Sequence, residues 1–107
     1  MAIRKPRGTQ DFLPEQMINW HYIEQRMREI CKVYGFNEIR TPAFEYTKLF
    51  LRGIGETTDV VKKEMYTFTT DEGGDSSYTL RPENTASAVR AYLENKVYGK
   101  EGLTKWY

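Results

Sequence analysis

Apolar side chains recur every three or four residues between Trp20 and Tyr34, and this spacing predicts the longest helix of the chain. Pro14 and Glu15 suit its first turn, because the missing N–H of proline is harmless there and a carboxylate favours a helix N-terminus. Gly35 suits its end, because glycine readily adopts the left-handed conformation that closes helices. We expect one broad apolar face, made by Trp20, Ile23, Met27, Ile30 or Cys31, and Tyr34.

Short strands are predicted after this helix. Phe36 to Arg40 reads as a strand that ends near Pro42, because the residue before a proline favours extended geometry. A second short strand, within residues 44–51, should run into a helical turn. The segment Gly53-Ile54-Gly55 lacks the third glycine of a dinucleotide fingerprint and follows no predicted strand, so it indicates a flexible turn instead.

A β-hairpin and a second helix complete the predicted elements. The hairpin pairs residues 64–70 with residues 77–80 across the turn-forming residues 71–75. The helix should run from Pro82 to about Lys96, and a further strand should begin at Leu103. The apolar face of this helix is expected to consist of Ala86, Val89, Leu93 and Val97. This order of elements favours an α+β fold with an antiparallel sheet over a doubly wound fold.

Composition narrows the classes of function. Of the 107 residues, 39% are hydrophobic and 29% are charged, which is typical of a soluble globular chain. A net charge of +1 gives no global electrostatic reason to expect a nucleic-acid or membrane surface. The single cysteine, Cys31, and the single histidine, His21, argue against a disulfide framework and a metal site, so we expect a core cysteine and a surface histidine. No signal peptide or long apolar run is visible, which makes the cytoplasm the expected compartment.

The segment from Thr79 to Ala86 joins the predicted hairpin to the second helix. Glu83 and Thr85 place a carboxylate and a hydroxyl at the mouth of that helix, where the helix dipole and unpaired N–H groups hold the carboxylate ionised. Such a pair suits an ammonium group, for example the α-amino group of an amino acid. It equally suits ordinary helix capping, which these residues alone favour. We expect Arg81 to pair with a nearby carboxylate and stiffen the loop.

Four stretches carry a family resemblance and follow one another in register along nearly all of the chain. They are PRGTQDFLP at 6–14, YGFNEIRTP at 34–42, DVVKKEMYTF at 59–68 and TLRPENTA at 79–86. Together they closely resemble the N-terminal part of bacterial histidyl-tRNA synthetases, which are class II aminoacyl-tRNA synthetases. The resemblance implies that residues 1–107 are the N-terminal portion of a class II catalytic domain, truncated at the start of motif 2 and without the anticodon-binding domain.

The resemblance also implies roles for particular residues. The long helix and the strand ending at Pro42 look like motif 1, which builds the homodimer interface of the family. Glu83, Asn84 and Thr85 look like the loop that binds histidine, with Glu83 and Thr85 on its α-amino group. Asn84 stands where many members of the family have glycine, so the family pattern does not fix the backbone conformation of this loop. Neither a catalytic residue nor a metal ligand is assigned within this chain.

The family reaction joins histidine to tRNA(His) through histidyl-adenylate, with ATP as substrate and Mg²⁺ as its ion. We expect the 107-residue chain to bind neither ATP nor Mg²⁺ by itself and to be inactive in histidine-dependent ATP–pyrophosphate exchange. It should self-associate through the long helix and the strand that ends at Pro42. In the parent enzyme, Glu83→Ala should raise the KM for histidine more than the KM for ATP.

Two alternatives stay open. The synthetase-like regulatory subunit of ATP phosphoribosyltransferase is a non-catalytic paralogue that acts in histidine biosynthesis. An aspartate-containing variant of the Arg-Pro-Glu-Asn-Thr-Ala segment is the expectation for that subunit. The other alternative is an interaction domain without a substrate.

Overall fold

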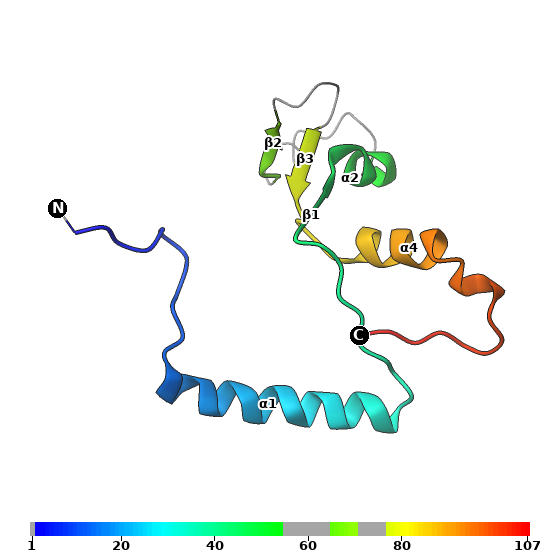
Figure 1. Ribbon diagram of the computed structural model, residues 1–107, viewed down its shortest axis with the longest axis horizontal. Helices are drawn as coiled ribbons and strands as arrows, with labels where there is room; N and C mark the ends of the chain where they lie inside the picture. The colour runs from blue at the N-terminus through cyan, green and yellow to red at the C-terminus, as the bar shows by residue number, and fades with distance from the viewer. Residues whose placement is uncertain (1, 55–64, 71–76) are drawn as a thin grey trace. The chain divides into compact units, whose positions relative to one another are not determined.

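The computed structural model describes residues 2–54, 65–70 and 77–107, which belong to two compact units (Figure 1). One unit runs to Glu38 and also includes Lys105–Tyr107, and the other comprises Ile39–Thr104. Helices and an antiparallel sheet are both present, so the predicted α+β class is confirmed. The sheet and the segment from Thr79 to Ala86 lie in the second unit.

The first unit is built on helix α1, which spans Pro14–Val33. A reciprocal pair of hydrogen bonds closes its first turn: the Gln16 N–H donates to the Leu13 carbonyl at 2.9 Å, and the Leu13 N–H donates to Oε1 of Gln16 at 3.0 Å. Just past the helix, Gly35 has a φ of +79°, which is left-handed. The predicted helix and its glycine stop are therefore confirmed.

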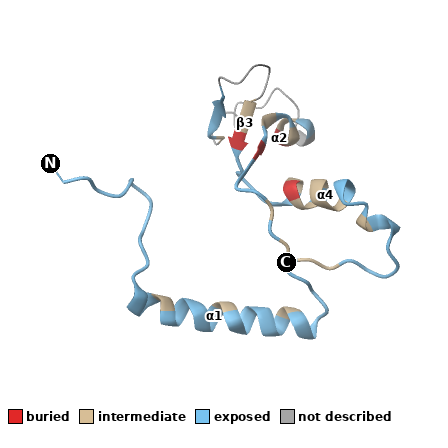
Figure 2. Ribbon diagram, viewed as in Figure 1, coloured by how far each residue is buried: buried red, intermediate tan, exposed pale blue. Residues whose placement is uncertain are grey.

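The apolar face predicted for α1 forms but is not covered. No residue of α1 is buried (Figure 2). The large side chains of this face are between 42% exposed, at Trp20, and 67% exposed, at Tyr34. His21 is exposed as predicted, whereas Cys31 is half-buried rather than in a core, because among the described residues of this unit no further helix or sheet packs on α1. The unit thus presents an apolar helix surface.

The strands predicted at residues 36–40 and from Leu103 are wrong as regular strands. The two segments meet in an isolated parallel bridge between Asn37 and Trp106. Asn37 donates its N–H to the Lys105 carbonyl at 2.9 Å and accepts from the Tyr107 N–H at 3.0 Å. A single pair of extended segments gains few hydrogen bonds and no neighbouring strand, so the ladder does not propagate.

The second unit contains a three-stranded antiparallel sheet in the order β1-β3-β2. Strand β1 spans Phe44–Tyr46, β2 spans Thr67–Thr69 and β3 spans Ser77–Leu80. In the central strand, Tyr78 pairs with Tyr46 on one side and with Phe68 on the other. The predicted hairpin is therefore confirmed as β2 and β3, while its turn at 71–75 lies outside the described residues.

Helix α2, which spans Thr47–Ile54, follows β1 directly, as predicted for a strand running into a helical turn. It packs beside the sheet and contains Phe50, which is buried. Gly53 and Ile54 belong to α2, so the turn predicted there is wrong for these two residues, and Gly55 lies outside the described residues. Packing against the sheet accounts for the longer helix, because tertiary contacts override the weak helix propensity of glycine.

Strand alternation gives the sheet two chemically different faces. Phe44, Tyr46, Phe68 and Tyr78 contact one another on one face, with ring centroids 5.2–5.8 Å apart. The other face carries Glu45 and the fully buried Thr79. Within the sheet, the buried residues are therefore polar rather than aromatic.

A chain of hydroxyl groups joins β2, β3 and α2. The Thr79 hydroxyl donates to Oγ1 of Thr47 at 2.9 Å and shares a hydrogen bond with the Thr67 hydroxyl at 2.9 Å. The Ser77 and Thr47 hydroxyls are 2.7 Å apart and share a further bond. Because each hydroxyl has a partner, Thr79 is buried without an unpaired polar group.

Helix α4 spans Thr85–Glu94 and is followed by a short 3-10 turn, Val97–Gly99. The predicted start at Pro82 is wrong, because the helix begins at Thr85. Asn84 is the N-cap, and its carbonyl accepts the first helical hydrogen bond, from the Ala88 N–H, at 3.0 Å. The predicted apolar face is also wrong in part. Val89 and Leu93 are exposed, whereas Ser87 is buried.

Candidate functional site

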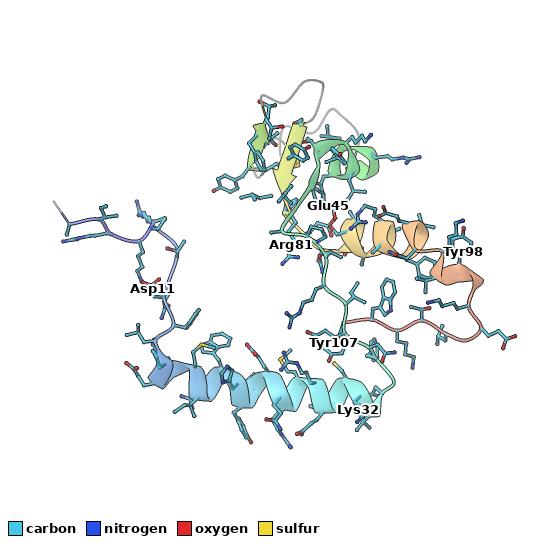
Figure 3. All side chains as sticks on the ribbon, in the orientation of Figure 1. Asp11, Lys32, Glu45, Arg81, Tyr98 and Tyr107 are labelled. Atoms are coloured by element: carbon cyan, nitrogen blue, oxygen red, sulfur yellow. The ribbon has the colours of Figure 1, made fainter. Side chains whose placement is uncertain are left out.

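Arg81 fixes the segment that joins β3 to α4 (Figure 3). Its N–H donates to the Ala43 carbonyl at 3.0 Å. Its Nη1 donates to the carbonyl of Thr41 at 3.0 Å and to that of Pro42 at 3.4 Å. The expected stiffening of the loop is therefore present, but the expected carboxylate partner is wrong: within the described residues the guanidinium binds main-chain carbonyls and the Thr41 hydroxyl.

The Glu83 carboxylate closes the N-terminus of α4. Oε2 accepts the Thr85 N–H at 2.6 Å, and Oε1 accepts the Ala86 N–H at 3.0 Å. The hydrogen bond from Ala86 is the largest cause of a pKa for Glu83 below its ordinary value of 4.5, and the Thr85 N–H and hydroxyl act in the same direction. The carboxylate is therefore ionised at neutral pH, and the capping interpretation is confirmed.

Capping leaves this carboxylate able to bind a ligand as well. A carboxylate has about four lone-pair positions, and two backbone N–H groups use only some of them. Glu83, Asn84 and Thr85 are all exposed. When the Thr85 hydroxyl donates to Glu83, its oxygen keeps lone pairs that accept from a third group. An ammonium group can therefore donate to both side chains at once.

Asn84 has a different role from that of an ordinary N-cap asparagine. Its side chain makes no capping hydrogen bond, because the Glu83 carboxylate accepts the N–H groups at the start of the helix. Its Oδ1 accepts instead from the Thr41 hydroxyl at 2.8 Å. The three residues expected to form the site are thus adjacent and exposed, and Thr41 is a neighbour that sequence reasoning missed.

A buried ion pair lies elsewhere in the same unit. Oε1 of Glu45, whose side chain is 7% exposed, accepts from Nε of Arg90 at 3.0 Å and lies 2.9 Å from Nη2. The hydrogen bond to Glu45 is the largest cause of a raised pKa for Arg90. This pair is not visible in the sequence, because a glutamate that alternates with two aromatic residues of a strand normally faces solvent, whereas here the glutamate is the buried residue.

A cavity of about 710 Å³ lies beside this ion pair. Glu45 and Arg90 line it together with Tyr46, Lys48, Leu49, Leu51 and Arg52. None of Glu83, Asn84 or Thr85 lines it, so the cavity and the candidate binding loop are separate features.

Within the described residues, no group of three or more His, Cys, Asp or Glu side chains is placed to hold a metal ion. In the same part of the chain, no helix is both long and apolar enough to cross a membrane.

The chain is similar to known proteins over nearly its whole length. The family described as histidyl-tRNA synthetase matches residues 8–107. A histidine–tRNA ligase of Pelotomaculum thermopropionicum is 64% identical over 98 residues, which are 92% of this chain and 23% of that protein. The structure of apo S. aureus histidyl-tRNA synthetase has a TM-score of 0.77 at 47% identity and covers 95% of this chain and 26% of its own.

A Bacillus halodurans structure is described as an ATP phosphoribosyltransferase regulatory subunit/histidyl-tRNA synthetase. It has a TM-score of 0.73 at 23% identity and covers 99% of this chain and 26% of its own, which shows a likeness of fold alone. The chain spans about a quarter of the length of the curated relatives that it matches.

Proposed function

The chain belongs to the histidyl-tRNA synthetase family, and from this premise we propose that it is the histidine-binding part of an ATP-dependent ligase that joins histidine to tRNA(His). The observation that carries the proposal is the ionised Glu83 carboxylate, held at the N-terminus of α4 beside the Thr85 hydroxyl. In the proposed reaction histidine attacks the α-phosphate of ATP to give histidyl-adenylate. The acyl group then passes to the terminal ribose of the tRNA.

Glu83 and Thr85 bind the α-amino group of histidine in this proposal, and Asn84 lies between them. The ammonium group donates to a carboxylate oxygen of Glu83 that the helix N–H groups already orient. Because these bonds hold the carboxylate in place before binding, little side-chain freedom is lost when histidine arrives. The role of the loop is to position the substrate.

No catalytic residue is assigned to the described residues of this chain. A phosphoryl-transfer transition state needs cationic stabilisation by arginine and Mg²⁺. Arg81, the arginine of the loop, donates to the Thr41 and Pro42 carbonyls, so its charge is directed at the main chain. We propose that ATP and Mg²⁺ bind to other parts of the enzyme.

We further propose a homodimer formed through α1 and a cytoplasmic location. The exposed apolar face of α1 and its C-cap, from Trp20 to Tyr34, supports the dimer, because large apolar side chains grouped on one exposed face mark a protein–protein interface. Family membership supports the cytoplasmic location, as translation requires contact with tRNA.

The regulatory paralogue is not favoured. Curated relatives at 56% to 64% identity are named histidine–tRNA ligase, whereas the structure with the regulatory description is 23% identical. The loop sequence also keeps Glu83 rather than the aspartate-containing variant expected for that paralogue.

The test uses a chimera of the Pelotomaculum thermopropionicum enzyme in which the 98 matching residues are replaced by those of this chain. Glu83→Gln keeps the side-chain size but removes the charge. A hydrogen bond to a charged group contributes about 1.5–3 kcal/mol, so we expect the KM for histidine in ATP–pyrophosphate exchange to rise about 10- to 100-fold. The KM for ATP should change little.

Glu15→Gln is the matched control, because Glu15 is an exposed carboxylate in the first turn of another helix, α1. It should leave both KM values unchanged. Equal increases in both KM values for Glu83→Gln would mean that the loop is structural. A chimera without exchange activity, beside an active parent, would overturn the ligase proposal.

A further inference from the structure

Thr41 connects two segments that are distant in sequence but adjacent in the second unit. Its hydroxyl donates to Oδ1 of Asn84 at 2.8 Å across a separation of 43 residues. Its carbonyl accepts from Nη1 of Arg81 at 3.0 Å. Thr41 is half-buried, whereas Asn84 is exposed. The Thr41 hydroxyl therefore holds the oxygen end of the Asn84 side chain.

The backbone of Thr41 is itself restrained. The following residue, Pro42, disfavours the helical conformation for Thr41 and keeps it extended. The Pro42 and Ala43 carbonyls each accept from Arg81, the former from the guanidinium and the latter from the main-chain N–H. Three successive carbonyls thus bind one arginine. Thr41 is consequently a fixed point from which the Asn84 amide is oriented.

This orientation determines which end of the amide remains for a ligand. The oxygen and nitrogen of an asparagine side chain lie in one plane and point to opposite sides of the Cβ–Cγ bond, so an oxygen bound to Thr41 turns the NH₂ group away from Thr41. Glu83 already accepts the first N–H groups of α4. Within the described residues the Asn84 NH₂ group has no hydrogen-bond partner, and Asn84 directly follows Glu83 in the sequence.

We propose that Thr41 is a positioning residue that aims the Asn84 NH₂ group at the α-carboxylate of the amino acid bound by Glu83 and Thr85. The inference rests on the proposed function. An α-amino acid carries its ammonium and carboxylate groups on one carbon, so a loop that binds the ammonium group has the carboxylate within reach. Glu83 accepts from the ammonium group, and Asn84 donates to the carboxylate, which matches both charges of the zwitterion.

A merely structural tie between the two segments predicts something different. If Thr41 only holds the loop together, its loss displaces Glu83 and Thr85 as well as Asn84. Binding of the ammonium group would then weaken together with binding of the carboxylate. The two interpretations separate when one ligand has a carboxylate and the other lacks it.

The experiment uses the full-length chimera described above and two probes, histidine and histamine. Histamine keeps the imidazole and the ammonium group and has no carboxylate. Thr41→Val removes the hydroxyl and keeps the side-chain shape, while Thr41→Ser keeps the hydroxyl. A neutral hydrogen bond contributes about 1 kcal/mol, so Thr41→Val should raise the KM for histidine about 5-fold. The inhibition constant of histamine should stay within experimental error, and Thr41→Ser should restore the KM.

A second variant protects the test against misfolding. Asn84→Gly removes the amide directly and should reproduce the same split between histidine and histamine. The double variant Thr41→Val/Asn84→Gly should be no worse than Asn84→Gly, because Thr41 acts through that amide. Unchanged constants in Thr41→Val, or a parallel loss for histamine, would overturn the inference. If Glu83→Gln has its expected effect in that case, the proposed function still stands.

Discussion

The buried pair of Glu45 and Arg90 gives the sharpest prediction of stability. Arg90→Met removes the guanidinium group but keeps most of the aliphatic stem, so the change leaves the Glu45 carboxylate without its partner. Removing one member of a buried pair costs about 3–5 kcal/mol. Because the Arg90 side chain is 28% exposed, water reaches the vacated position. We expect a loss of about 2–3 kcal/mol in the free energy of unfolding of the 39–104 unit.

The two partners should not be equivalent. In Glu45→Gln the amide oxygen still accepts from Arg90, and the guanidinium group is partly hydrated, so the expected loss is about 1 kcal/mol. The double variant Glu45→Gln/Arg90→Met has no buried charge and should be more stable than Arg90→Met alone. Glu94→Gln is the control, since Glu94 also contacts Arg90 but is 68% exposed and should matter little.

Amide hydrogen exchange provides a local assay. The Leu80 N–H donates to the Tyr66 carbonyl at 2.9 Å and the Arg81 N–H donates to Ala43, so both amides report opening of this unit. Tryptophan fluorescence is less suitable, because Trp20 and Trp106 belong to the other unit. Equal losses for Glu45→Gln and Arg90→Met, or a double variant worse than either, would refute the reasoning that a buried unpaired charge is responsible.

Three further outcomes concern single side chains of the same unit. Ser87→Ala removes a buried hydroxyl that has no hydrogen-bond partner among the described residues. It should raise the free energy of unfolding by up to about 1 kcal/mol in the same exchange assay. A decrease in that free energy would show that the hydroxyl has a hydrogen-bond partner. Thr79→Val removes the buried hydroxyl that bonds to Thr47 and Thr67, and it should lower the free energy of unfolding by about 1–2 kcal/mol in urea unfolding. An unchanged free energy would mean that these hydroxyl hydrogen bonds contribute nothing to stability. The Glu83 cap should be pH-dependent: because its pKa is lowered in the folded state, its stabilisation is complete above the ordinary value of 4.5 and is lost as the pH falls through the lowered value. Thermal unfolding of Glu83→Gln should therefore be less sensitive to acid than that of the unsubstituted chain, and parallel pH profiles would contradict the assignment.

Local signals in the sequence predicted the elements that local interactions build. Helix α1 was predicted because its apolar period and the glycine at position 35 act within a few residues. The hairpin of β2 and β3 was predicted for the same reason, since the alternation lies on both sides of one turn. The carboxylate at the start of α4 was also visible, because capping depends on Glu83 and the two residues after it that donate N–H groups.

Contacts between distant segments could not be predicted. The inward position of Arg90 depends on Glu45, which lies 45 residues earlier, so periodicity alone placed Val89 and Leu93 on the wrong side of α4. Thr41 reaches Asn84 across a similar distance. The strand predicted at 36–40 depended on a neighbouring ladder that forms only a single bridge. In each case the deciding partner is set by tertiary structure rather than by local pattern.

The strand order β1-β3-β2 has a consequence for the way in which the second unit assembles. The hydroxyl bond between Thr67 and Thr79 spans 12 residues, whereas the one between Thr79 and Thr47 spans 32. Closing the longer loop costs about 1 kcal/mol more in chain entropy, so the hairpin should form before β1 docks on it. Arg81 meets the carbonyls of residues 41–43 only when β1 is in place. The main-chain support of the segment from Arg81 to Thr85 should therefore form only when β1 docks, whereas the Glu83 cap, which depends on neighbouring residues, can form without it.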